Sequence, residues 1–200
     1  ALYRWQRMKV LMWKARMSNP LHNGLVGMAV QAITGTGKTH GAIACARVWF
    51  NHHGDESRLV IVVPTEALQI QWYSIMVEMR MGNVARQGAK RKYDGFSPIV
   101  IVTQNSLKRI VNHRNFHNKQ TMYILDEAHK AGAKGCMKQL REANRIGTMQ
   151  ACLAISGTIH RTDGRCIMDI TGHDGYYNGK RKPHIVYGYR DALKDDVIPP

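Results

Sequence analysis

Five short apolar segments that contain β-branched residues recur along the chain, each followed by a polar residue or a proline. Segments of this length and composition predict strands that are buried on both faces of a sheet. We expect these strands at residues 25–30, 59–63, 99–102, 122–125 and 152–155.

The stretches between the strands are long enough for helices, which we expect at residues 38–50, 65–81, 106–113 and 134–146. Ahead of them, Trp5, Met8, Met12 and Ala15 recur at helical spacing, and Pro20 then ends the run. This pattern predicts a leading helix that uses those four residues as its apolar face. Because strands and helices alternate, the fold class is α/β, with a mostly parallel sheet covered by helices on both faces.

Two hundred residues are enough for one compact domain and too few for two large ones. We expect residues 1–24 to form the leading helix and a linker, and residues 25–200 to form one domain. Residues 87–98 combine glycine, proline and several basic side chains, which predicts an exposed basic loop. Residues 164–183 are similarly rich in glycine, tyrosine and charge. Because the chain starts at Ala1 rather than at a methionine, we expect a fragment of a longer protein.

Charge and cysteine usage narrow the class of protein. The chain has 29 Lys and Arg against 14 Asp and Glu, a formal net charge of +15. This excess favours a polyanionic partner such as nucleic acid, although a solvated basic surface would have the same composition. The four cysteines include no C-x-x-C pair, which argues against structural zinc and against a disulfide framework. No apolar run approaches the ~20 residues that cross a bilayer, so we expect a soluble, cytoplasmic protein with no membrane partner.

The segment 32–39, with the sequence Ala-Ile-Thr-Gly-Thr-Gly-Lys-Thr, follows a predicted strand and opens a predicted helix. Unpaired backbone N–H groups meet phosphate at such a junction. Glycines let the loop curl, a lysine neutralises the β and γ phosphates, and a hydroxyl binds Mg²⁺. Ala32 replaces the first glycine of the commoner Walker A motif and leaves the cradle intact. The alternative is a glycine turn before a helix. We expect ATP to bind at Thr34, Gly35, Thr36, Gly37, Lys38 and Thr39, with Thr39 also binding the metal.

A pair of carboxylates, Asp126 and Glu127, directly follows the fourth predicted strand. In a doubly wound sheet the strand ends gather on one edge, so this pair and the phosphate loop can meet. Asp126 is expected to contact Mg²⁺, and Glu127 to orient or deprotonate the attacking water. The alternative is an acidic helix N-cap stabilised by the helix dipole.

Asp126, Glu127, Ala128 and His129, taken with the phosphate-loop form Ala-x-x-Gly-x-Gly-Lys-Thr, resemble the DEAH-box group of superfamily 2 helicases. Further segments match this family in the expected order over nearly the whole chain. The resemblance implies a RecA-like P-loop NTPase domain, the first of two motor domains. It also implies that Gln6 reads the adenine edge and that His129 bridges the ATP site to a coupling motif. The alternatives are a surface glutamine and a core histidine.

Two segments resemble the motifs with which the family grips a nucleic-acid backbone. In the first, Pro64 and Thr65 stand at a strand end and are followed by Gln71 and Trp72. A helix that begins at Thr65 offers amides and a hydroxyl to a phosphate, although a simple helix cap has the same sequence. The second has the same alternative and consists of Thr103, Gln104, Asn105 and Ser106.

Ser156, Gly157 and Thr158 resemble the Ser-Ala-Thr motif that couples ATP hydrolysis to strand movement in the family. Gly157 replaces the usual alanine, and Ile159 stands where many relatives have proline. Arg161 then opens a segment similar to the Arg-x-Asp-Gly of restriction, repair and phage members, for which the alternative is an Asp-Gly turn.

The resemblance implies an ATP-dependent helicase or translocase that uses ATP and Mg²⁺ on a nucleic-acid track, with DNA favoured over RNA. The Gln-x-x-Gly-Arg-x-x-Arg motif, which supplies an arginine finger from the second RecA-like domain of relatives, is absent from this sequence. Arginine fingers are worth about 10³ to 10⁵ in rate, so we expect full turnover to need that second domain. Three alternatives stay open: a double-strand translocase without strand separation, a nucleic-acid-binding module with a latch-type ATP site, and an unrelated P-loop enzyme.

Overall fold

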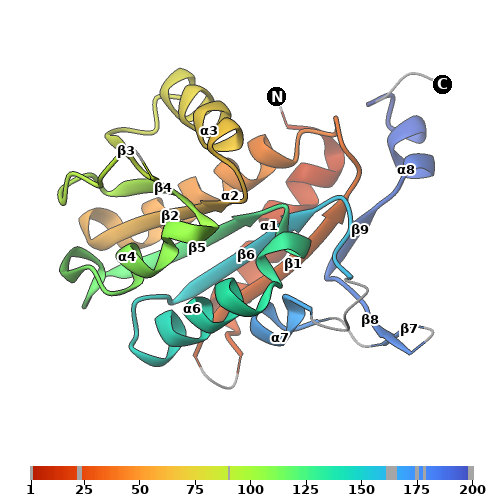
Figure 1. The fold of residues 1–200 in the computed structure, drawn as a ribbon. Helices are drawn as coiled ribbons and strands as arrows, with labels where there is room; N and C mark the ends of the chain where they lie inside the picture. The colour runs from red at the N-terminus through yellow and green to blue at the C-terminus, as the bar shows by residue number, and fades with distance from the viewer. Residues whose placement is uncertain are drawn as a thin grey trace.

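The computed structural model of the chain describes residues 2–21, 24–89, 91–160, 166–173, 176–177 and 179–197. Its centre is a seven-stranded sheet in which every neighbouring pair of strands is parallel (Figure 1). From one edge to the other the strands are β3 (Val84–Gln87), β4 (Ile99–Thr103), β2 (Ser57–Val63), β5 (Gln120–Asp126), β6 (Ala151–Ser156), β1 (Val26–Ala32) and β9 (Ile185–Tyr187). A separate antiparallel pair consists of β7 (Tyr176–Tyr177) and β8 (Lys180–Arg181).

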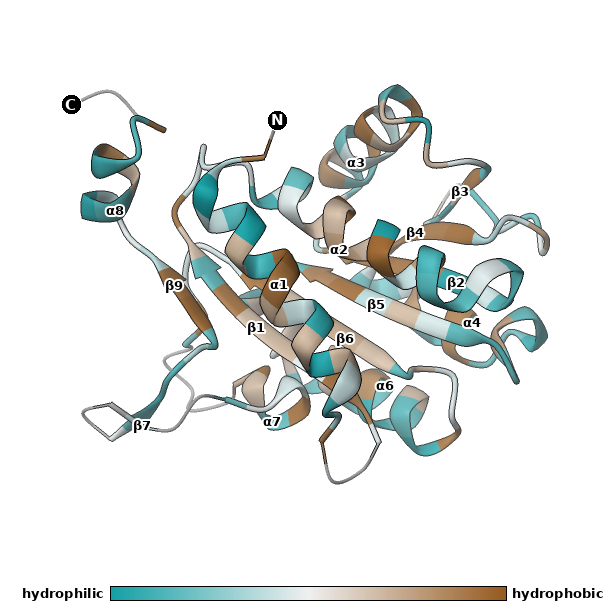
Figure 2. Cartoon of the chain, turned by 180° about the vertical axis from the view of Figure 1, so that it is seen from behind, coloured by the Kyte–Doolittle hydropathy of each residue, from teal (hydrophilic) through white to brown (hydrophobic). Residues whose placement is uncertain are grey.

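Helices cover both faces of the sheet, as Figures 1 and 2 show from opposite sides. One face carries α1 (Arg4–Ser18), α2 (Lys38–His53) and α3 (Glu66–Glu78). The other carries α4 (Leu107–Val111), α5 (Ala128–Ala131), α6 (Lys134–Arg145) and α7 (Met168–Thr171). Helix α8 (Tyr189–Lys194) follows the edge strand β9, and the 3-10 turns are η1 (Gly54–Glu56), η2 (Gln104–Ser106) and η3 (Arg114–Phe116).

Strand β2 illustrates why the central strands read as continuous apolar runs. Its residues Leu59, Ile61 and Val63 belong to the hydrophobic cluster under α1, α2 and α3. Val60 and Val62 alternate with them and belong to the cluster under α4 and α6. All five are 0% exposed, because successive strand side chains point to opposite faces and both faces are covered. The predicted α/β class, with its mostly parallel sheet and helices on both faces, is confirmed.

All five predicted strands and the four helices predicted between them are present, with ends displaced by at most three residues. The apolar face predicted for the leading helix is wrong in part. Trp5 and Trp13 are buried, but Met8 is 56% exposed, and the other two buried positions of α1 are the polar residues Gln6 and Lys9. The two large indoles direct the packing, because they remove more apolar surface from water than methionine or alanine does.

The loop predicted at residues 87–98 begins one residue later than expected, because an unpredicted strand, β3, precedes it. Strand β3 ends at Gln87, which is paired with Val102 of β4 and is 4% exposed. The side chain of Gln69, on α3, donates hydrogen bonds to the carbonyl groups of Gln87 (3.0 Å) and Ile101 (2.8 Å). Only two of the four residues of β3 are apolar. The strand therefore lacks the apolar run or alternation by which strands are predicted from sequence.

Helix α7 lies directly on β1 at Gly27. A Cβ atom added there would be 2.3 Å from the carbonyl oxygen of Thr171, which is backbone and has no room to move. Helix α7 therefore packs directly against the backbone of β1, the strand that leads into the phosphate loop. Within the described ranges, every helix is too short or too polar to cross a membrane.

Candidate functional site

The loop between β1 and α2 is curled tightly on itself. Gly35 and Gly37 have positive φ angles of +83° and +75°, and the Thr36 hydroxyl donates a 2.7 Å hydrogen bond to the carbonyl of Ile33. Gly37 is the N-cap residue of α2. The first amides of this 16-residue helix therefore have no partner within the helix, and the helix dipole adds positive potential at the same point. The geometry is that of an anion site.

Lys38 lies across this loop, half-buried, with its Nζ donating a 2.9 Å hydrogen bond to the carbonyl of Ile33. Burial lowers the pKa of its amine, and the nearby carboxylates of Glu127 and Asp126 oppose that shift. The charges of the two predicted motifs therefore act on each other, as expected when strand ends gather at one edge. Thr39, the next residue, is half-buried beside it.

Gln6 fastens the leading helix to the loop. Its Nε2 donates to the carbonyl of Gly37 (2.9 Å) and more weakly to that of Thr36 (3.4 Å), while its Oε1 accepts from the backbone N–H of Tyr3 (2.8 Å). A Cβ at Gly37 would lie 2.5 Å from the Gln6 Nε2 and would displace this amide, while the positive φ is what favours glycine there. With 2% of its surface exposed, Gln6 reaches adenine only if this amide is uncovered.

Asp126 ends β5, and both of its carboxylate oxygens accept hydrogen bonds. Trp72 Nε1 donates to Oδ2 at 2.7 Å, and the backbone N–H of Glu127 donates to Oδ1 at 2.9 Å. Burial raises the pKa of Asp126, and these hydrogen bonds oppose the shift. Glu127 has a left-handed backbone (φ 46°) and stands at the N-cap of α5 without a capping side-chain hydrogen bond. The Glu127 side chain therefore does not cap helix α5, contrary to the alternative considered for this acidic pair.

His129 connects the acidic motif to the end of the neighbouring strand β6. Its Nδ1 lies 2.8 Å from the Ser156 Oγ and 3.4 Å from the Glu127 Oε2. The same Ser156 Oγ accepts the backbone N–H of Thr158 at 3.3 Å. A Cβ at Gly157 would meet nothing closer than 3.9 Å, so the alanine that the family usually has at this position would also fit here.

The residues expected at a nucleic-acid backbone lie at the carboxyl ends of β2 and β4, which are neighbours in the sheet. Thr65 is exposed and caps α3, its Oγ1 accepting the N–H of Leu68 at 3.3 Å, so the capping alternative is realised there. In the second segment only Asn105 is exposed, whereas Thr103 and Ser106 are buried. Pro64 and Gln104 are half-buried. Arg161 and the rest of its segment, to residue 164, lie outside the described residues.

Two side chains at this edge were not predicted from the sequence. Trp72 was noted only as part of a motif, yet it holds the carboxylate of Asp126. Lys9 was not singled out, yet it is completely buried beneath the phosphate loop, where its Nζ lies 3.4 Å from the carbonyl of Lys38. Its spacing of four residues from both Trp5 and Trp13 was the one available signal.

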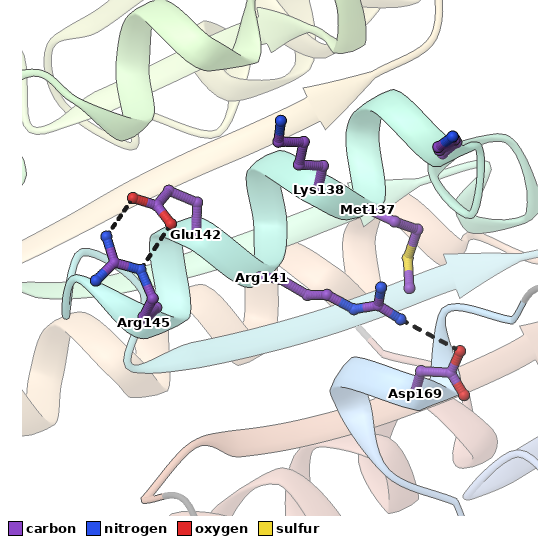
Figure 3. Close-up of a pocket in the computed structure, with 7 residues that line it drawn as sticks. Met137, Lys138, Arg141, Glu142, Arg145 and Asp169 are labelled. Atoms are coloured by element: carbon purple, nitrogen blue, oxygen red, sulfur yellow. Dashed lines mark hydrogen bonds and ion pairs between the residues drawn. The ribbon is translucent and has the colours of Figure 1, made fainter.

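A basic groove of about 500 Å³ lies on the opposite face of the sheet, along α6 and next to α7 (Figure 3). Two of its cations are held by carboxylates: Arg141 Nη2 is 3.8 Å from Asp169 Oδ2, and Arg145 Nη2 is 2.6 Å from Glu142 Oε1. The groove is lined by Lys134, Met137, Lys138, Arg141, Glu142, Arg145 and Asp169. Its four basic residues lie on one face of α6, at spacings of three and four residues, and none of them was predicted as a site residue.

Comparison with solved structures identifies the fold. The chain is similar to the SWI2/SNF2 ATPase core of Sulfolobus solfataricus in complex with dsDNA (18% identity, TM-score 0.60, 82% of this chain and 34% of that one). It is also similar to the Hef helicase domain of Pyrococcus furiosus (14%, 0.65, 94% and 39%) and to the UvsW helicase from bacteriophage T4 (20%, 0.54, 70% and 49%). The chain thus spans less than half of each of these proteins.

The family is established by sequence. No curated protein matches the chain, but residues 14–164 match the model of the DEAD/DEAH box helicase family. That range contains the phosphate loop, the acidic motif and the Ser156 segment that the fold brings to one edge of the sheet. The RecA-like α/β fold is shared with the solved helicase and ATPase cores above, and the chain belongs to the DEAD/DEAH box helicase family.

Proposed function

We propose that this domain binds ATP and, as part of a DEAH-type helicase, couples ATP hydrolysis to unwinding of nucleic acid or to translocation along it. The observation that carries the proposal is the link from the phosphate loop to the coupling segment. Glu127 and Asp126 act on the charge of Lys38, and His129 in the same motif is 2.8 Å from Ser156. A change at the phosphates can therefore be transmitted to the end of β6 through Lys38, the acidic motif and the contact between His129 and Ser156.

The phosphates are expected at the N-terminus of α2, where free amides and the helix dipole favour anions. Lys38 would exchange its hydrogen bond to Ile33 for the β and γ phosphates, which the flexible amine allows. The Thr39 hydroxyl and the Asp126 carboxylate fit Mg²⁺ because this ion prefers oxygen ligands and is bound by one or two carboxylates beside phosphate. Bound Mg²⁺ would neutralise charge on the phosphates.

Glu127 is assigned the role of orienting or deprotonating the attacking water. The Asp126 carboxylate is held by Trp72 and by the N–H of Glu127, whereas the Glu127 carboxylate lies 3.4 Å from the His129 Nδ1. These different partners support different roles for the two adjacent carboxylates. Trp72 restrains Asp126 through the 2.7 Å hydrogen bond and would keep that carboxylate in place when the metal binds. Gln6 is assigned adenine recognition, with the requirement that its amide gives up part of its contact with the phosphate loop.

The nucleic-acid track is assigned to the carboxyl edge of β2 and β4. Thr65 and Asn105 are exposed there and supply polar atoms to phosphates, a mode of contact that positions a backbone without reading bases. Pro64, Thr103, Gln104 and Ser106 would support them. We propose DNA rather than RNA as the track. We also propose that a second RecA-like domain completes the ATP site, since arginine fingers contribute about 10³ to 10⁵ in rate.

The test is steady-state ATPase activity and ATP binding of the purified chain, with and without single-stranded DNA or RNA. Lys38→Ala should abolish ATP binding, and Glu127→Gln should preserve binding while abolishing turnover. Glu78→Gln is the matched control. Glu78 is an exposed carboxylate at the end of α3, and its substitution removes the same charge as Glu127→Gln does. Mg²⁺-dependent ATP binding with slow turnover would support the need for a second domain. Absence of ATP binding would refute the proposal, and strand displacement by the full-length protein would separate unwinding from translocation.

A further inference from the structure

Lys9 is a buried cation directly behind the phosphate loop. Its side chain is 0% exposed, which is rare for lysine. The Nζ lies 3.4 Å from the carbonyl oxygen of Lys38, the first residue of α2, and 5.7 Å from the centre of the Trp5 ring. Within the described ranges, the ion pairs formed by acidic side chains do not include Lys9. The charge is therefore held by a carbonyl dipole and an aromatic face.

Helix α2 packs directly against this side chain. Gly41 lies in the first turns of α2. A Cβ at Gly41 would lie 3.4 Å from the Lys9 Nζ and 3.5 Å from its Cδ, which are ordinary van der Waals distances. The ammonium group therefore lies against the backbone of α2, about one helical turn from the phosphate loop.

Lys9 gains little from its surroundings in the nucleotide-free protein. Burial is the largest influence on its pKa and lowers it to about 8, and the positive charge of Lys38 lowers it further. Cys45 and Asp126 act in the opposite direction but do not compensate. An apolar side chain in this slot would avoid that cost. Anionic phosphates at the N-terminus of α2 would be a strong, nearby partner for the charge, since attraction is poorly screened in a buried environment.

We propose that Lys9 is a second cation of the nucleotide site, which acts from behind the loop to favour the phosphates of ATP and to hold the first turn of α2 through the Lys38 carbonyl. Lys38 meets the phosphates from the front, and Lys9 adds a buried charge beneath them. This inference rests on the proposed ATP binding. Because Lys9 acts through charge and does not touch the ligand, its effect should grow with the number of phosphates.

The experiment measures the affinities of the full chain for ATP, ADP and adenosine by isothermal titration calorimetry. Lys9→Met removes the charge and keeps most of the side-chain volume. Lys9→Gln also removes the charge but retains an N–H donor for the Lys38 carbonyl. Lys14→Met is the matched control, since Lys14 is an exposed lysine of the same helix. Circular dichroism establishes whether each variant is folded.

Both Lys9 variants are expected to bind ATP about tenfold more weakly, ADP with a smaller loss, and adenosine as the wild type does. Lys14→Met should bind all three like the wild type. Equal losses for the three ligands would indicate a packing role and overturn the inference, as would full affinity in Lys9→Gln or loss of folding in Lys9→Met. If the wild type binds ATP and Lys9→Met binds it equally well, only this inference fails. If the wild type binds no ATP, the proposed function fails with it.

Discussion

Replacement of Lys9 by methionine is expected to stabilise the fold. The pKa of this amine falls from its ordinary value of 10.5 to about 8, with burial as the main cause. At about 1.4 kcal/mol per pKa unit, burying the charged form costs roughly 3 kcal/mol. Methionine removes this cost and fills a similar volume. The carbonyl of Lys38 keeps a partner, because a carbonyl in the first helical turn accepts the N–H four residues later.

The gain should depend on pH in a defined direction. Between about pH 8 and 10.5 the unfolded chain binds the Lys9 proton and the folded chain loses it, so the stability of the wild type rises with pH in that window. Below pH 8 the full cost is present. The charged or titratable groups that act on Lys9 are Lys38 and Cys45 from α2 and Asp126 from β5. Burial raises the pKa of Cys45 to about 11, so this thiol stays neutral through most of the window.

Urea unfolding at pH 7 and pH 9.5 measures the effect. Lys9→Met should be more stable than the wild type by roughly 3 kcal/mol at pH 7, or about 6 to 12 °C in melting temperature, and the difference should shrink at pH 9.5. Lys14→Met serves as the exposed control and should change stability little at either pH. A Lys9→Met protein that is less stable than the wild type, or a gain that is the same at both pH values, would show that the buried charge does not carry this cost.

Two single contacts give further predictions. Gly27→Ala should destabilise the domain by about 3 kcal/mol in urea unfolding, because its Cβ would meet the Thr171 carbonyl at 2.3 Å; a loss below 0.5 kcal/mol would contradict this packing. His129→Ala should keep ATP affinity but lose stimulation of the ATPase by nucleic acid, and adding Ser156→Ala should cause no further loss; additive losses would show that the 2.8 Å contact is not the shared element.

The fold class was accessible from the sequence because both faces of the sheet are covered. Residues such as Val60 and Ile61 are buried whichever face they point to, so the central strands appear as unbroken apolar runs. The edge strand β3 lacks this constraint and was missed. The face of α1 was misread because apolar spacing alone does not rank Trp13 above Met8, although burial of an indole removes far more apolar surface from water.

The chemical groups of this domain could be identified from the order of residues alone: a glycine loop with Lys38 before a helix, and two adjacent carboxylates after a strand. Each motif is local in the chain. Which of these groups meet depends on the packing of the folded domain. The Gln6 amide on the loop, the His129 and Ser156 pair, and Lys9 beneath Lys38 each join residues at least 27 positions apart. Such contacts depend on how helices and strands pack against one another, and neither hydrophobic period nor motif spacing encodes that packing.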